Sequence, residues 1–236
     1  MTAAGPPAAE EIGVNPAASR PPIGFRLNVP DEMVAFDLDP ASSDAWLERL
    51  LDQRSADVVG AAAQRSRTRQ VLQNVIAQHR DADVFFAAFL AGSGPRPGDL
   101  VGAGLTFAWR QFAGGIDMAG LETFFTEEEP GPGEDVTARE VRRVELPAGP
   151  AVLVRSRIQL PVPLTSRRQD VVVVQHLVPV PDSEWLAVLT MTTPDVAEAD
   201  GFAEFAGRVA ASLEFLDVPE PPNGRPRGTI GYLPPS

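Results

Sequence analysis

The sequence of 236 residues contains no cysteine and no lysine, and each absence excludes a group of functions. Without cysteine there can be no disulfide, no thiolate nucleophile, no iron–sulfur cluster and no cysteine-ligated zinc. Without lysine there can be no Schiff-base intermediate, no pyridoxal-phosphate attachment and no P-loop lysine that holds a nucleotide phosphate. All twenty basic side chains are therefore arginine.

Histidine is almost absent as well, since His79 and His176 are the only two. They lie far apart in the sequence and fit no metal-ligand spacing such as HExxH. We expect His79 near the C-terminal end of a helix, where the helix dipole favours a cation. We expect His176 to be buried or half-buried in a strand, because it alternates with valines. GxSxG and GxGxxG motifs are also missing, so the sequence predicts no enzyme, no cofactor and no metal site.

The charge balance argues against two classes of partner. The formal net charge is −12 and the isoelectric point is near 4.6. Nucleic acid and anionic membranes both repel such a surface, so neither is an expected partner. The first residues do not resemble a signal peptide, and no run of about 20 apolar residues follows. We therefore expect a cytoplasmic location, with signal-independent export left open.

Composition divides the chain into a core and two ends. Residues 1–22 are rich in alanine and proline and 219–236 are rich in proline, so both are expected to be flexible tails. Residues 23–218 have the apolar content of a single globular domain. Tyr232, the only tyrosine, lies in a small apolar tip of the C-terminal tail. That tip either docks on a partner or is a plain solvated end.

Periodicity predicts a mixture of helices and strands. Two β-like runs, 25–29 and 33–38, form a hairpin or two short strands at the start of the domain. The remaining elements of the first half are a helix capped by Ser42 or Ser43, a second helix over 58–80, β-like runs at 83–92 and 100–107 around a hairpin-like loop, and a short helix over 116–125.

The second half carries the strongest β signal. Long β-like runs at 139–146, 151–160, 169–180 and 184–193 are joined by short turns, and short connections force antiparallel pairing. The sequence thus predicts a four-stranded antiparallel meander, followed by a helix over 203–213 that covers one sheet face. The fold class is α+β, an antiparallel sheet covered by helices.

Three segments also resemble the Mog1/PsbP-like fold family. They are the stretch VVVVQHLVPVPDSEWLAVLTMTTP with the helix that follows it, the segment from Ala211 to Phe215 (ASLEF), and the opening strand from Phe25 to Pro30. The good match covers under a third of the chain. The resemblance implies a sheet sandwiched by helices that mostly serves as a binding or assembly module. It implies no catalytic motif and no functional residue.

Arginine is concentrated between residues 139 and 168. Seven arginines and two acids give this segment a net charge of +5 within an acidic chain. Strand alternation puts Arg155 and Arg157 on one face, where they can bind carboxylates or other anions bidentately. The alternative is a solvated face whose arginines pair with the protein's own acids. The candidate binding residues are Arg142, Arg143, Arg155, Arg157, Arg167, Arg168 and Tyr232.

The sequence alone therefore favours a non-enzymatic protein-interaction or assembly module with an unidentified protein partner. We hypothesise that an acidic segment of that partner binds the arginine strip. The alternative is a domain that binds a small molecule or anion, including an enzyme without a motif that uses carboxylates and arginine. A deep, closed pocket lined by both charges favours the alternative, whereas an exposed sheet face favours the interaction module.

Overall fold

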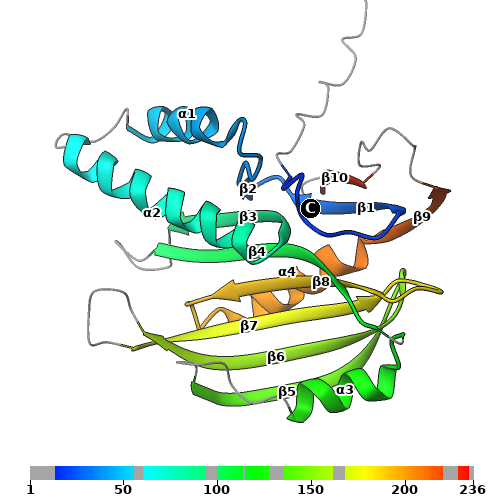
Figure 1. Cartoon of the computed structure of the whole chain (residues 1–236). Helices are drawn as coiled ribbons and strands as arrows, with labels where there is room; N and C mark the ends of the chain where they lie inside the picture. The colour runs from blue at the N-terminus through cyan, green and yellow to red at the C-terminus, as the bar shows by residue number, and fades with distance from the viewer. Residues whose placement is uncertain are drawn as a thin grey trace, which may run out of the picture.

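The computed structural model describes residues 14–55, 61–93, 100–113, 115–127, 135–161, 168–219 and 228–233. Within them the chain forms four helices and ten strands (Figure 1). In chain order these are β1 Ile23–Pro30, β2 Val34–Ala35, α1 Ser43–Ser55, α2 Ala61–Asp81, β3 Val84–Ser93, β4 Leu100–Gln111, α3 Met118–Glu127, β5 Asp135–Leu146, β6 Gly149–Pro161, β7 Arg168–Pro179, β8 Trp185–Thr193, α4 Ala199–Ala211, β9 Glu214–Pro219 and β10 Gly228–Leu233.

The larger of two sheets has seven strands in the order β2-β3-β4-β8-β7-β6-β5. Every neighbouring pair in it is antiparallel. The predicted α+β class with an antiparallel sheet is confirmed. The predicted four-stranded sheet is too small. β8 also pairs with β4, β4 pairs with β3, and β3 pairs with β2, which gives seven strands. Local turn signals identify β5 to β8, but they cannot reveal that β8 pairs with β4, a strand far earlier in the chain.

The opening strands do not form a hairpin. β1 belongs to a three-stranded sheet, whereas β2 pairs with β3 in the large sheet. Pro30 ends β1 and has no backbone N–H with which to extend a ladder. The buried side chains of β1, Leu27 and Val29 among them, contact the same core as the large sheet. The alternative of two short strands is therefore the correct one.

The small sheet has the order β10-β1-β9, with β10 parallel and β9 antiparallel to β1 (Figure 1). Residues 228–233, which composition places in a flexible tail, thus form a strand. Ile230 of β10 is 9% exposed and belongs to the main core. Composition could not predict this strand, because it forms by parallel pairing with β1, which lies at the opposite end of the chain.

Truncation of Ile230 tests whether this strand stabilises the domain. We expect Ile230→Ala to lower the free energy of unfolding in urea by about 2 kcal/mol, the low end for a buried isoleucine, because β10 is an edge strand. Val71→Ala is the control, since Val71 is 54% exposed on α2 and its truncation should change little. Equal stability of Ile230→Ala and the wild type would show that β10 contributes nothing to the fold.

The predicted N-terminal tail of residues 1–22 is packed in its described part. The backbone N–H of Asn15 donates to the carbonyl of Phe85, at 2.9 Å, and Ala18 is buried in the main core. Residues 1–13 lie outside the described part of the chain. Within that part, no helix is long and apolar enough to cross a membrane.

Helices cover both faces of the large sheet. Leu121 of α3 packs on one face, against alternate residues of β6 and β7 such as Val152 and Leu177. α4 packs on the other face against β7 and β8, and it also contacts β1 (Figure 1). α4 thus lies over the middle of the sheet, whereas β5 is an edge strand with no buried residue. The α4 side of β5 and β6 carries Glu140, Arg142, Arg155 and Arg157.

Candidate functional site

Arg142, Arg155 and Arg157 lie on the α4 side of the sheet. Arg155 lies opposite Val174 of β7, and Arg157 lies opposite Val172; both valines belong to the core on which α4 packs. Arg142 of β5 lies opposite Leu153, two residues before Arg155, and therefore projects to the same side. We call the surface formed by Arg142, Arg155 and Arg157 the arginine face. The strand register thus places Arg155 and Arg157 on one face of β6, as predicted.

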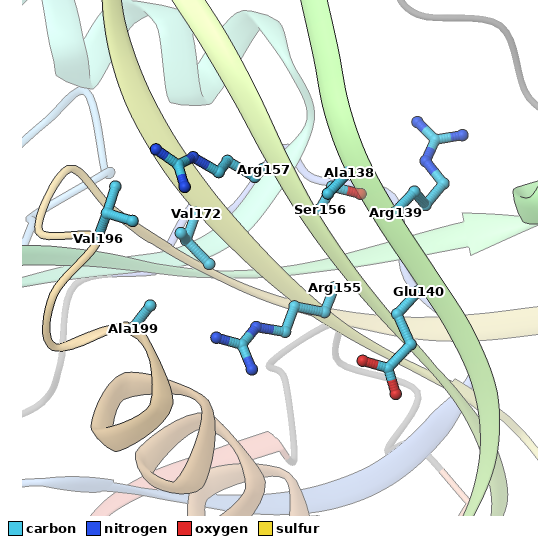
Figure 2. A pocket seen from close by; sticks show the side chains of 9 residues that line it. All are labelled: Ala138, Arg139, Glu140, Arg155, Ser156, Arg157, Val172, Val196 and Ala199. Atoms are coloured by element: carbon cyan, nitrogen blue, oxygen red, sulfur yellow. The ribbon is translucent and has the colours of Figure 1, made fainter.

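A pocket of about 320 Å³ lies on this face. Its lining comprises Ala138, Arg139, Glu140, Arg155, Ser156, Arg157, Val172, Val196 and Ala199. Figure 2 shows Arg155 and Arg157 extending from β6 toward Val196, in the turn before α4, and Ala199, the first residue of α4. Arg139 extends away from them, and its guanidinium donates to the carbonyl of Phe125 in α3. The pocket thus brings two guanidiniums to the start of α4.

The start of α4 is fixed by a short turn. Thr193, the last residue of β8, is buried, and its hydroxyl donates to the carbonyl of Gly102. The Asp195 carboxylate then accepts hydrogen bonds from the backbone N–H groups of Ala197 and Glu198. This local side-chain turn positions the first turn of α4 beside β6. Asp200 lies in that first turn.

Both arginines of the pocket are ion-paired within the protein. A terminal nitrogen of Arg155 lies 2.6 Å from a carboxylate oxygen of Asp200. Arg157 pairs with Asp170 of β7, and the Gln159 amide also donates to Asp170, at 2.8 Å. The hydrogen bond from Arg157, and next that from Gln159, hold the pKa of Asp170 below its usual value. These contacts match the alternative in which the protein's own acids neutralise the strip.

Arg142 pairs with Glu140, two residues earlier on the same strand, with 3.3 Å between nitrogen and oxygen. It also lies near His176, which is 4% exposed and whose Nδ1 has no hydrogen-bond partner among the described residues. Burial, and secondarily the Arg142 charge, lower the pKa of His176 to about 4. The imidazole is therefore neutral at physiological pH. The structure agrees with the expected buried sheet histidine.

The other predicted residues do not join the arginine face. Arg143 projects to the opposite side of β5 and pairs with Glu122 of α3, at 2.9 Å. Arg168 lies on the α4 side by register, opposite Pro161, but it is at the end of the β6–β7 ladder and donates to the carbonyl of Gln159. Arg167 lies outside the described residues. Tyr232 pairs with Val29 in the β10–β1 ladder, far in sequence and topology from the arginine strip.

Sequence reasoning missed the carboxylates of the site. Asp200, Asp170 and Glu140 are dispersed among 32 acidic residues, and nothing in their local sequence distinguishes them. One signal was available for Glu140 alone: it sits on the same predicted strand as Arg142, two residues away, and so faces the same side. Asp200 and Asp170 come to the arginines only through the position of α4 and the β6–β7 register.

Other chemistry finds no support among the described residues. His79 lies in the last turn of α2, as expected, and burial lowers its pKa. Its ring contacts Phe36, with 5.8 Å between ring centroids. In the part of the chain that the structure describes, no three histidine, aspartate or glutamate side chains gather as metal ligands would.

The sequence matches no protein-family model and no curated protein. The resemblance to the Mog1/PsbP-like fold therefore stays a prediction from three short segments. Any functional conclusion has to come from the side chains of the arginine face.

Proposed function

We propose that this protein is a non-enzymatic interaction module that binds an acidic segment of a partner protein on the arginine face. The observation that carries the proposal is the pocket, into which the Arg155 and Arg157 side chains both extend from β6, beside an incompletely covered sheet. Guanidinium groups bind carboxylates through two parallel hydrogen bonds, so this arrangement suits an acidic ligand.

The charged groups that line the pocket are three arginines and one glutamate. Arginine does not release its proton at physiological pH, so it supplies charge recognition rather than acid–base chemistry. Two of the internal ion pairs of the arginine face, Arg142–Glu140 and Arg155–Asp200, are largely solvent-exposed, and such pairs contribute only about 0–1 kcal/mol. Exchange of an internal carboxylate for one from a partner therefore costs little.

Charge reversal at Arg155 tests the proposal. The probe is a fluorescein-labelled peptide rich in glutamate, with the matched glutamine peptide as its neutral counterpart, and binding to the full chain is followed by fluorescence anisotropy. We expect wild-type protein to bind the glutamate peptide in preference, and more weakly as salt is raised. We expect Arg155→Glu to weaken that binding at least tenfold, because it removes a bidentate contact and adds repulsion.

Arg143→Glu is the matched control. It makes the same charge change, and it likewise separates an arginine from one helix carboxylate, but on the opposite face of the sheet. We expect it to weaken binding by less than about threefold, through long-range repulsion alone. Circular dichroism and urea unfolding check that both variants keep the fold. If both variants lose the same affinity for the glutamate peptide, net charge alone explains the loss, and a specific site at Arg155 is contradicted.

The same pocket supports a second candidate function, the binding of a small organic anion. Its volume of about 320 Å³ is at the lower end of small-molecule sites. Titration with a free dicarboxylate such as glutarate distinguishes the two. If glutarate binds as tightly as the glutamate peptide and displaces it, the small-anion function replaces the interaction module.

A further inference from the structure

The two arginines of the pocket differ in how firmly their internal partners are held. Asp170 has a side chain that is 29% exposed and is fixed by both Arg157 and Gln159. Asp200 has a side chain that is 88% exposed, and within the described part of the chain it pairs with Arg155. A carboxylate in contact with bulk water exchanges easily, whereas one fixed by two donors does not. Arg155 is thus available to a ligand, and Arg157 is committed to the sheet.

Arg142 resembles Arg155 in this respect. Its pair with Glu140 is long, at 3.3 Å, and both side chains are more than half exposed. Arg142 lies opposite Leu153, so Arg155 is its diagonal neighbour on the adjacent strand. Diagonal neighbours in an antiparallel pair are about 7–8 Å apart between Cα atoms. The arginine face therefore offers two weakly paired guanidiniums on side chains whose Cα atoms are about 7–8 Å apart.

That separation matches one pattern of acidic residues. An extended chain rises about 3.3 Å per residue and alternates its side chains, so residues i and i+2 present carboxylates on one side about 7 Å apart. Neighbouring residues i and i+1 point to opposite sides and cannot both reach the face. A helix would need acids three or four residues apart instead.

We infer that the Asp200 carboxylate occupies the place that a ligand carboxylate takes on Arg155, and that the ligand is an extended protein segment with acidic residues at alternate positions. One ligand carboxylate replaces Asp200 on Arg155, and the second replaces Glu140 on Arg142. This inference rests on the proposed function and specifies its ligand. Asp200 then acts as an internal competitor that the ligand must displace.

Neutralising Asp200 tests the exchange. The probe is a fluorescein-labelled nonapeptide whose two glutamates are separated by one valine, Gly-Val-Val-Glu-Val-Glu-Val-Val-Gly, titrated with the full chain. We expect Asp200→Asn to bind it about two- to fivefold more tightly than the wild type, the range that corresponds to one exposed ion pair. The gain should vanish in the Asp200→Asn/Arg155→Gln double variant, which should bind no better than Arg155→Gln.

Glu204→Gln is the matched control for Asp200→Asn. Glu204 is exposed one turn later on the same helix, and its removal changes the net charge equally. We expect it to alter affinity by less than about 1.5-fold, because the effect of its charge on a distant ligand is screened. A gain in Glu204→Gln equal to that in Asp200→Asn, or no gain in Asp200→Asn, overturns the role of Asp200 as competitor.

A second peptide of the same composition tests the alternate spacing. In Gly-Val-Val-Glu-Glu-Val-Val-Val-Gly the two glutamates are adjacent. We expect it to bind at least threefold more weakly than the alternate peptide, and Arg142→Gln to remove that difference. Equal affinity of the two peptides contradicts the extended ligand.

The outcomes separate this inference from the proposed function. If the wild type binds the alternate peptide but Asp200→Asn binds it no more tightly, Asp200 is not a competitor and the interaction module stands. If neither the wild type nor Asp200→Asn binds either peptide more tightly than a glutamine version, both the inference and the proposed function are wrong.

Discussion

Replacement of Phe25 by alanine is expected to lower the free energy of unfolding by about 3–5 kcal/mol, the usual cost of removing a buried phenylalanine. Phe25 of β1 is 2% exposed. Its ring centroid lies 5.5 Å from that of Phe85, 5.4 Å from that of Phe107 and 5.1 Å from that of Trp109. These three rings belong to β3 and β4 of the large sheet, so Phe25 is a principal contact between the two sheets.

The geometry of this cluster explains why the loss should be large. Its rings meet mostly edge to face, an arrangement that contributes beyond the burial of apolar surface. Alanine at position 25 would leave a cavity bounded by rigid rings on strands that cannot easily close around it. The loss in the free energy of unfolding should therefore include most of the penalty for an unfilled cavity.

Phe124→Ala is the control for this measurement. Phe124 is 52% exposed on α3, so its truncation should change stability by less than about 1 kcal/mol. Urea unfolding, monitored by circular dichroism, compares both variants with the wild type. A loss below about 1 kcal/mol for Phe25→Ala would mean that the two sheets are not joined through this aromatic cluster.

Lowering the pH from 7 to 4 is expected to remove about 3 kcal/mol of stability through His176 alone. Burial keeps this imidazole neutral and lowers its pKa from 6.5 to about 4, while in the unfolded chain it protonates near 6.5. A group whose folded pKa lies below its unfolded value stabilises the fold fully above the unfolded pKa. The contribution is then lost as the pH falls from about 6.5 to about 4, because the unfolded chain takes up the proton first.

The pH dependence of His176→Leu isolates this contribution. Leucine fills a similar apolar space and cannot be protonated, so the free energy of unfolding should fall less between pH 6.5 and 4 than it does in the wild type. His79→Gln is the control, since burial lowers the pKa of His79 as well. This variant should keep the part of the pH dependence of the free energy of unfolding that comes from His176. A His176→Leu variant with the full wild-type slope would assign the acid sensitivity to other groups.

Proton NMR offers an independent readout of the same group. The chain has only two histidines, so each single variant assigns the remaining imidazole. We expect one resonance to titrate near pH 4 and to disappear in His176→Leu. Titration of that resonance near 6.5 would mean that the ring is solvated.

Much of the local structure could be predicted because it depends on neighbouring residues. The alternation of Arg155 and Arg157 with Val152 and Val154 defines two faces of a strand, and the structure keeps both faces. Short turns likewise identify β5 to β8 as successive antiparallel strands. The apolar stripe of α4 is local as well, since helical spacing brings Phe202, Ala206 and Val209 to one buried side.

Pairings between distant segments were not predictable in this way. β4 extends the large sheet from β8, and β10 joins β1 from the other end of the chain. Local composition does not indicate either pairing, because a strand with an apolar face can pair with many other strands. The apolar side chain of Ile230 was visible in the sequence, but its burial depends on where β1 lies.

Residue composition alone excludes several kinds of chemistry. The lack of cysteine and lysine removes thiolate and Schiff-base chemistry, and seven arginines lie between residues 139 and 168 of an acidic chain. These conclusions depend only on which side chains exist. They hold for any fold that the chain adopts.

Which of the arginines share a face, and which carboxylates pair with them, depends on how the elements pack. Strand register separates Arg143 from Arg142, although they are adjacent in sequence, and α4 brings Asp200 to Arg155 from a distant part of the chain. The physical reason is that charge recognition requires groups within a few ångströms, and that proximity is set by sheet order and helix packing. A site of this kind is therefore a property of the fold, built from residues that the sequence keeps apart.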